Sequence, residues 1–208
     1  MTKKRSLNKP LWLLCACILS SAASAQQVLD QSQTLYNGGT SARNLPGYSE
    51  WQSFTAGLTG TLTEVDMGFF AGINANGGTS MSGVGTLNVY LGNGLGGTLL
   101  QSEAVNVWAT SSATYAPVCW NQWKTNVASV AGQMYTFDFV PGAGLPDPYG
   151  VCVGTNNLTA PYTAGSYDGG NMFSMNFETW VTPAPEPCSM LAVGGFIVGL
   201  LRRTLRKS

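Results

Sequence analysis

Glu64 and Asp66 are the residues of this 208-residue sequence whose types and spacing best suit acid–base chemistry. If their segment is a strand, both side chains lie on one face, about 6.6 Å apart. Inverting glycosidases hold their two carboxyl groups at about 6.5 to 9.5 Å. The sequence contains no histidine, which excludes Ser-His and Cys-His nucleophiles and histidine-ligated metals. Because Val65, Met67 and Phe69 form the apolar set of the same segment, we expect the two acids to form a solvated face without catalysis.

Aromatic residues give the second chemical signal. Trp120, Trp123 and Tyr115 lie in "TYAPVCWNQWK", a stretch without clean alternation, beside the amides of Asn121 and Gln122. Flat rings next to amides suit sugar rings, whose C–H faces stack while their hydroxyls need polar partners. We therefore predict glycan contact here, with burial as core anchors as the alternative. Other aromatics that could extend such a surface are Trp51, Trp108, Tyr149, Tyr162 and Tyr167.

The cysteines and acids outside these stretches suggest a disulfide and leave a metal site open. Cys119 and Cys152 are the two cysteines of the middle of the chain, and two cysteines in an exported domain usually pair. Closing that loop would stabilise the fold by about 3 to 4 kcal/mol. We expect no cofactor. Calcium is the alternative, with unassigned oxygen ligands among turn-like segments near Asp30, Asp138, Asp147 and Asp168.

Short alternating segments predict the elements that carry these residues. "EVDMGFF", "TLNVYLG", "MYTFDFV" and "MFSMNFETWV" alternate apolar and polar residues with a period of two, and "EWQSFTA", "TLLQSEAVNV" and "YGVCVG" are further strand candidates. "GNGLGG", "NANGG" and "YDGGN" supply turn residues that tolerate positive φ. Residues 26–182 show no sustained helical stripe. We therefore predict an all-β domain, an antiparallel β-sandwich of jelly-roll-like form.

The N-terminal 25 residues are typical of a secretory signal peptide. A basic start, "MTKKRSLNKP", precedes the apolar run "LWLLCACILS" and the small residues Ala23, Ser24 and Ala25. We expect cleavage between Ala25 and Gln26. Lipidation at Cys17 is the alternative, although the apolar stretch before it is very short.

The C-terminal residues 183–208 predict a second membrane signal. The apolar run Cys188 to Leu201 has 14 residues, which as a helix spans about 21 Å against about 30 Å of hydrocarbon. Basic residues behind it would stay in the cytoplasm, so residues 26–182 would lie outside. These basic residues are Arg202, Arg203, Arg206 and Lys207.

This tail resembles the PEP-CTERM sorting signal of Gram-negative bacteria. Pro185, Glu186 and Pro187 match the motif, and the Gly-containing apolar helix and "RRTLRK" follow in the same order. The resemblance implies processing by an exosortase, a membrane-embedded cysteine transpeptidase. Cys188 departs from the pattern, in which a small polar residue would follow the motif. An ordinary single-pass anchor after a Pro-rich linker is the alternative.

The middle of the chain is similar to β-sandwich modules of secreted bacterial proteins that look like carbohydrate-binding domains. The similarity runs, in order, through "WQSFTAGLTGTLTEVDMGFF", "GTLNVYLGNGLGGTLLQSEAVNV", "VAGQMYTFDF" and "AGSYDGGNMFSMNFETWV". Such modules often end in Asp-Leu-x-Phe-Arg-Thr, where this chain has residues 174–179 as Ser-Met-Asn-Phe-Glu-Thr. The roles of that Asp and Arg therefore do not transfer.

The charge distribution argues against two classes of binding partner. Residues 26–182 hold two basic and nine acidic residues, a net charge of −7 between two basic ends. Such a body repels nucleic acid and anionic lipid. We expect an exported, non-catalytic protein that is anchored in the inner membrane as a precursor and then reaches the cell surface or extracellular matrix. Its partners would be an exosortase-type transpeptidase and a neutral exopolysaccharide. A secreted glycan-active hydrolase that uses the carboxylate pair is the alternative.

Overall fold

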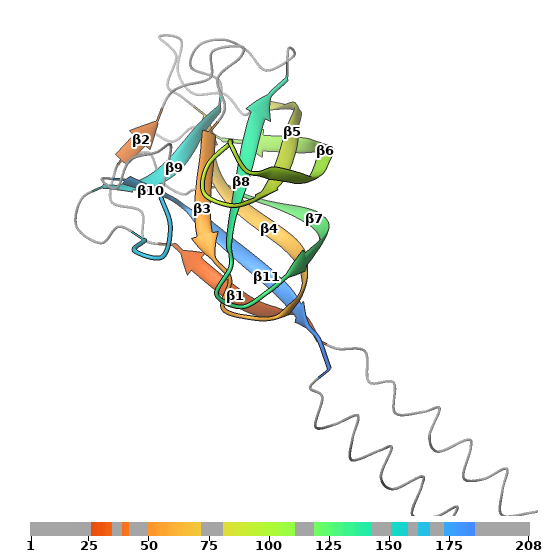
Figure 1. The fold of residues 1–208 in the computed structure, drawn as a ribbon. Coiled ribbons are helices and arrows are strands. Elements are labelled where there is room, and N and C mark those ends of the chain that lie inside the picture. Colours follow the sequence, from red (N-terminus) through yellow and green to blue (C-terminus); the bar gives the residue numbers. More distant parts are fainter. Residues whose placement is uncertain are drawn as a thin grey trace, which may run out of the picture.

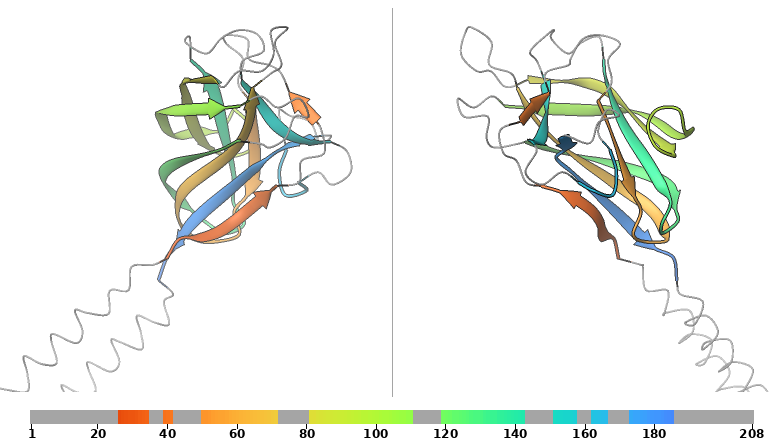
Figure 2. Two further views of the ribbon diagram at one scale, coloured as in Figure 1. Left: turned by 180° about the vertical axis from the view of Figure 1, so that it is seen from behind. Right: turned by 60° about the vertical axis from the view of Figure 1, so that its left-hand side comes forward.

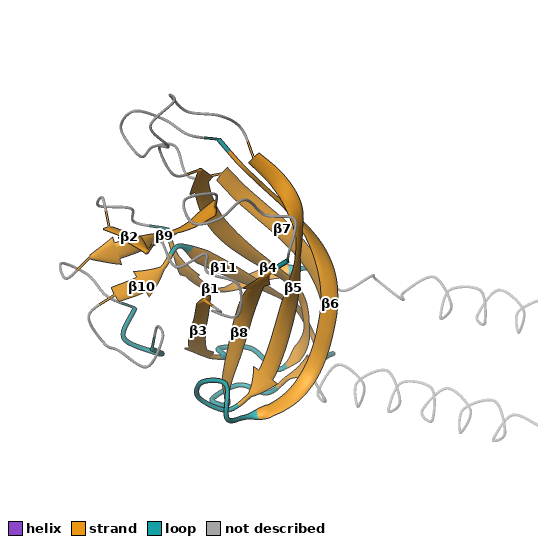
Figure 3. Cartoon of the chain, turned by 90° about the horizontal axis from the view of Figure 1, so that it is seen from above, coloured by secondary structure: helices purple, strands orange, loops and turns teal. Residues whose placement is uncertain are grey.

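A computed structural model of the chain describes residues 26–34, 39–41, 50–71, 81–110, 119–142, 151–157, 162–166 and 173–185. These residues form strands and loops without a helix (Figure 3). The strands are β1 (Val28–Gln33), β2 (Gly39–Ser41), β3 (Glu50–Thr55), β4 (Gly60–Ala71), β5 (Met81–Leu91), β6 (Thr98–Ala109), β7 (Cys119–Ser129), β8 (Met134–Pro141), β9 (Val151–Asn157), β10 (Phe173–Met175) and β11 (Phe177–Pro183).

The strands form two antiparallel sheets that pack as a sandwich (Figures 1 and 2). The first sheet has the order β1-β11-β4-β9-β10, with β7 on the other edge of β4 and β2 beside β9. The second sheet has the order β3-β8-β5-β6. The predicted all-β fold with antiparallel sheets is therefore confirmed.

The core lies between the sheets and follows the predicted alternation. In β4, Val65, Met67 and Phe69 are all fully buried, and Phe137 of β8 faces them from the second sheet. Phe69 packs edge-on against Phe139, with ring centroids 5.1 Å apart. Period-two apolar residues point to one face of a sheet, so the alternating segments predicted within β4, β5 and β8 each identified one strand. The fourth segment, residues 172–181, was predicted as one run but forms two strands, β10 and β11, with Asn176 between them. The rest of the aromatic core comprises Phe54, Trp123, Tyr135 and Phe177.

A β-bulge in β4 sets the direction of the two carboxylates. Leu62 pairs with Val181 of β11, and Glu64 pairs with the adjacent residue, Trp180. Thr63 is therefore an extra residue in β4 without a partner position in β11. A bulge changes the phase of a strand. Leu62 can therefore face the core while Glu64, two positions later, lies on the exterior face.

Side chains join the two sheets where β6 and β7 lie beside each other. Asn121 Oδ1 accepts a hydrogen bond from the backbone N–H of Trp108 (2.8 Å), and Asn121 Nδ2 donates to the Trp108 carbonyl (2.9 Å). Trp123 Nε1 donates to the carbonyl of Asn106 (2.7 Å). We call this junction the β6–β7 seam. It satisfies backbone groups of an edge strand that would otherwise be open to another chain.

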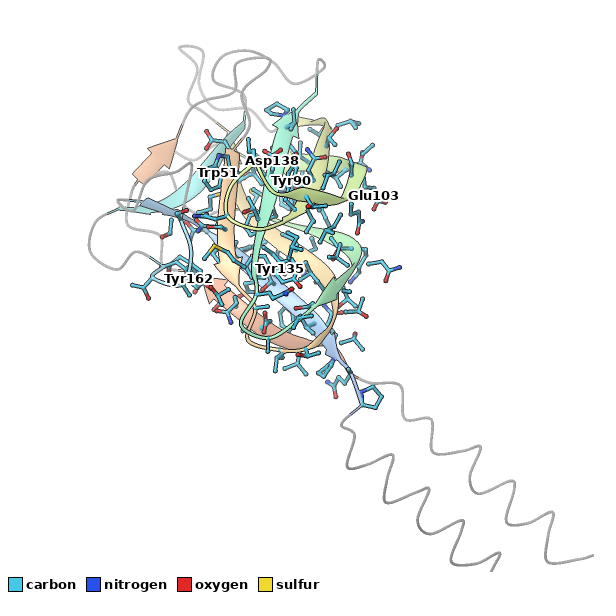
Figure 4. The ribbon with its side chains drawn as sticks, viewed as in Figure 1. Trp51, Tyr90, Glu103, Tyr135, Asp138 and Tyr162 are labelled. Carbon is cyan, nitrogen blue, oxygen red and sulfur yellow. The ribbon has the colours of Figure 1, made fainter. Side chains whose placement is uncertain are left out.

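The turn between β5 and β6 covers part of the second sheet's exterior. Gly94 has φ +74° and donates its N–H to Thr136 Oγ1 (2.8 Å), which holds the turn against β8. A Cβ at Gly94 would approach the Trp51 ring at 3.3 Å. Trp51, which pairs with Asp138 across the strands (Figure 4), is consequently only 9% exposed.

Candidate binding face

The exterior of β11, β4 and β7 brings Glu64 and Asp66 together, as their spacing predicts. Glu64 forms an ion pair with Lys124 of β7, whose side chain is 76% exposed. Asp66 Oδ2 accepts a hydrogen bond from Trp180 Nε1 of β11 (2.9 Å). The expectation that both acids are solvated was wrong, since Glu64 is 6% and Asp66 2% exposed. Their neighbours on β7 and β11 cover them, although they lie on the outer face of the sheet.

Burial changes the acidity of Asp66. Desolvation raises the pKa of this carboxyl above 3.8, hydrogen bonding by the side chains of Trp180 and Gln122 opposes that rise, and the charge of Glu178 adds to it. A buried carboxylate that is only partly compensated favours its neutral form. Asp66 is therefore a weaker acid than an exposed aspartate.

Trp123 does not take part in a surface site, and its predicted glycan contact was wrong. The ring is 5% exposed and stacks on Phe139, with centroids 5.4 Å apart and an interplanar angle of 13°. The prediction failed because β7 alternates fully from Cys119 onward, with polar residues at several inward positions. Asn121 and Thr125 are such residues, and they hide the apolar period in the sequence.

Trp120 lies on the exterior face, as the glycan hypothesis requires. It pairs with Gly68 of β4, which has no side chain to cover it, and it is half-buried. Tyr115, the third predicted contact, lies outside the described residues. Of the additional aromatics, Trp108 of β6 is 51% exposed and lies across the β6–β7 seam.

Trp180 is a residue of this face that the sequence did not single out. It pairs with Glu64 and stays half-buried, while its Nε1–H is fixed by Asp66. Trp180 pairs with Glu64 on one side of β4, and Trp120 pairs with Gly68 on the other side, four residues further along the strand. This register places the two tryptophan Cα atoms about 16 Å apart. We call the exterior surface that carries Trp120 and Trp180 the tryptophan face. In the alternating pattern of β11, Phe177 points to the core, so Trp180, three residues later, points to the exterior face. This alternation was the feature of the sequence that could have identified Trp180.

The remaining predicted aromatics are structural where they are described. Trp51 lies under the β5–β6 turn, and Tyr162 packs edge-on against Phe177 with centroids 5.1 Å apart. Burial, with the negative charge of Asp30, raises the pKa of Tyr162 to about 12. Its hydroxyl donates to Gln31 Oε1 of β1 (2.7 Å), which ties the 162–166 segment to the first sheet (Figure 4). Tyr149 and Tyr167 lie outside the described residues.

Cys119 is a free, buried cysteine, so the predicted Cys119–Cys152 disulfide does not form in this structure. The register pairs Phe69 of β4 with Cys119 on one edge and Phe70 with Cys152 on the other. Two strand spacings separate the cysteine Cα atoms by about 10 Å, beyond the about 4.4 to 6.8 Å of a disulfide. Cys119 Sγ instead accepts a hydrogen bond from the N–H of Thr110 (3.3 Å).

Within the described ranges, no group of three or more acidic or cysteine side chains is arranged to hold a metal ion. Asp30 accepts hydrogen bonds from the N–H of Gly57 (3.0 and 3.2 Å), and Asp138 accepts one from Asn88 Nδ2 (3.0 Å). The other two calcium candidates, Asp147 and Asp168, lie outside the described residues. The calcium hypothesis thus gains no ligand set here.

The processing residues lie at the limits of the described chain. Gln26 and Pro185 are exposed, at the beginning and the end of the domain. Ala25, Glu186, Pro187 and the basic residues Arg202, Arg203, Arg206 and Lys207 lie outside the described residues. The part of the chain that the structure describes contains no helix with the length and apolar character of a membrane span. No known protein-family model and no curated protein matches the chain.

Proposed function

We propose that this chain is an exported, non-catalytic protein of the cell surface or extracellular matrix that associates with a neutral exopolysaccharide through the tryptophan face. The observation that carries the binding part is the pair of half-buried tryptophans on one exterior surface, with the Trp180 indole fixed by Asp66. A ring held in one orientation loses little entropy when a sugar stacks on it. Trp108 would extend the same surface across the seam.

The charges of this surface support a neutral ligand. Lys124 is paired with Glu64, and Asp66 and Glu178 remain as acids beside the tryptophans. A polysaccharide rich in uronate or sulfate would meet like charge there. Neutral hydroxyls, by contrast, can donate hydrogen bonds to carboxylate and amide oxygens.

Binding of the mature protein to a neutral and to an anionic exopolysaccharide tests this part. We expect retention by the neutral polymer, weakened about fivefold or more in the double variant Trp120→Ala, Trp180→Ala, since stacking contacts contribute about 0.5 to 1.5 kcal/mol each. Leu99→Ala, which removes an apolar side chain that is 51% exposed on β6, is the matched control. Equal binding by the double variant and the control would refute the tryptophan face as the site.

Export and sorting rest on the two ends of the sequence. We propose that residues 1–25 direct export and that an exosortase-type transpeptidase processes the tail at the Pro185-Glu186-Pro187 motif, with the inner membrane as the transient location of the precursor. Mass spectrometry of the protein from its native host tests this. A C-terminus near Pro187 supports sorting, whereas an intact Ser208 would indicate an ordinary anchor.

The carboxylate pair favours one second candidate, a glycan hydrolase. Asp66 has a raised pKa, as a general acid needs, while Glu64 lies next to an ammonium group. Pairs of carboxyl groups with different surroundings often divide acid and base roles. Release of reducing ends from the bound polysaccharide, abolished by Glu64→Gln, would support this candidate over the non-catalytic one.

A further inference from the structure

Four chain segments meet at the end of the sandwich where the described chain begins and ends. Pro183 at the end of β11 pairs with Gly60, and Gly60 pairs with Ser129 at the end of β7. The N–H of Ala184 donates to the carbonyl of Thr59 (3.0 Å). The start of β1 lies beside the end of β11 in every view (Figures 1 and 2). We call residues 26–29, 57–61, 129–133 and 182–185 together the exit pole.

The exit pole differs chemically from the rest of the domain. Its four segments contain no acidic or basic residue, although residues 26–182 carry a net charge of −7. Three of its apolar side chains face solvent, namely Val28 (43% exposed), Leu29 (41%) and Val130 (44%). One carboxylate lies against these segments, that of Asp30, which accepts hydrogen bonds from the N–H of Gly57 (3.0 and 3.2 Å). A surface with one such acid and exposed aliphatic side chains meets less repulsion at a lipid surface than the acidic body does.

An apolar groove continues this surface along the side of the sandwich. The groove has a volume of about 340 Å³, and Val130 and Gln133 of the pole are among the residues that line it. Its other apolar walls include Leu91, Leu100 and Val127. Leu91 and Leu100 are themselves 36% and 43% exposed. The apolar area at and beside the exit pole is therefore larger than scattered single side chains would give.

The sequence places the apolar tail within a short reach of this pole. Ala184 is hydrogen-bonded to the domain, and three residues, 185–187, stand between it and the apolar run that starts at Cys188. Even fully extended, three residues span only about 10 Å. If the apolar run is in the bilayer, the domain cannot lie far from the lipid headgroups.

We infer that the exit pole is a membrane-contact surface, which rests on the outer leaflet of the inner membrane for as long as the tail is attached. The inference rests on the proposed function, because it takes residues 188–201 as the membrane segment. The partner is the lipid surface itself, entered at the interfacial depth of about 5 to 10 Å that amphipathic elements reach. Three aliphatic side chains bind lipid weakly on their own, and the tether supplies the high local concentration that keeps them there. Removal of the tail therefore also releases the domain from the bilayer.

The test uses residues 26–208 reconstituted in nanodiscs of phosphatidylethanolamine and phosphatidylglycerol. A genetically encoded fluorescent amino acid replaces Ala131, an exposed residue of the exit pole. In a control protein it replaces Ser82, an exposed residue at the end of β5 that lies away from the exit pole. Lipids brominated near the headgroup quench by contact. We expect at least twofold stronger quenching at position 131 than at position 82. The double variant Leu29→Glu, Val130→Glu should remove that difference, whereas Val84→Glu, at a side chain 53% exposed near the far end, should keep it.

The outcomes separate the inference from the proposed function. A chain retained by the nanodisc but equally unquenched at both positions overturns the membrane-contact surface and leaves the anchor intact. A chain not retained by the nanodisc overturns both. Circular dichroism of each variant verifies that the β-sandwich is folded, and a linker of Gly and Ser inserted after Pro185 should reduce quenching at position 131 in the folded, retained chain.

Discussion

Asp66 is a polar residue that lies on the outer face of its sheet and is nevertheless buried. Its carboxylate fixes the indole of Trp180 through a 2.9 Å hydrogen bond, and its exposure is only 2%. In the proposed non-catalytic function, Asp66 would therefore position the tryptophan face and would not contact the ligand. The raised pKa is the energetic cost of that role, since the charged form is desolvated.

This cost predicts a pH-dependent effect of Asp66→Asn on stability. Because folding raises the pKa of Asp66 above 3.8, the folded protein binds this proton more tightly than the unfolded chain. The contribution of Asp66 to stability is thus fully present below about pH 3.8 and is lost as pH rises through the folded pKa. Asn cannot ionise and keeps an oxygen for Trp180. We expect Asp66→Asn to be more stable than the native protein at pH 7, by a margin that shrinks as pH falls toward 4, in urea unfolding.

Asp66→Ala is the control for the hydrogen bond. It removes both the charge and the acceptor, so the half-buried Trp180 N–H loses its partner. We expect this variant to be less stable than Asp66→Asn by about 1 to 2 kcal/mol. Equal stability of the two variants across the pH range would contradict a positioning role for Asp66.

The sequence predicted which residues face the core wherever apolar types fill the inward positions. Met67, Phe69 and Phe137 are such residues, and each is fully buried. Trp123 was harder to place because the inward side of β7 also carries Asn121 and Thr125. Burial of those polar groups depends on partners from other strands, which no local pattern can supply.

At the scale of elements, the β6–β7 seam determines whether the two sheets close along this side. Asn121 contributes two hydrogen bonds to the backbone of Trp108 and a third to the carbonyl of Cys119 (3.1 Å). Both of its amide groups are used, and the side chain is 3% exposed. The pairing of Glu64 and Trp180 depends likewise on an element-level feature, the bulge at Thr63, which the sequence did not reveal.

Asn121→Ala should therefore destabilise the sandwich more than an ordinary polar substitution. Loss of the three hydrogen bonds leaves partly buried backbone groups of Trp108 unpaired, and we expect a decrease of about 2 to 3 kcal/mol in the free energy of unfolding. Asn126→Ala on the same strand is the matched control, since its side chain is exposed and should change stability by less than about 0.5 kcal/mol. Similar urea midpoints for the two variants would show that the seam does not hold the sheets together.

At the scale of the whole molecule, the first sheet brings the two ends of the domain side by side. β1 pairs with β11 from Val28 opposite Val181 to Gln33 opposite Phe177. The expected signal cleavage after Ala25 leaves two residues before β1, and the expected sorting motif starts two residues after β11 ends at Pro183. Both processing events would thus occur at the exit pole and spare every described strand.

This arrangement predicts that two terminal deletions will affect thermal stability differently. Removal of residues 186–208 takes away no described strand or hydrogen bond, so residues 26–185 should unfold at the same temperature as residues 26–208, within about 2 °C in a thermal scan. Further removal of residues 26–33 deletes β1, which exposes the edge of β11 and breaks the Tyr162–Gln31 hydrogen bond. We expect that shorter chain to unfold at least about 10 °C lower or to lose its cooperative transition. If the tail deletion alone abolished the transition, the sandwich would not be an independent folding unit and the contacts that hold it would have to include the tail.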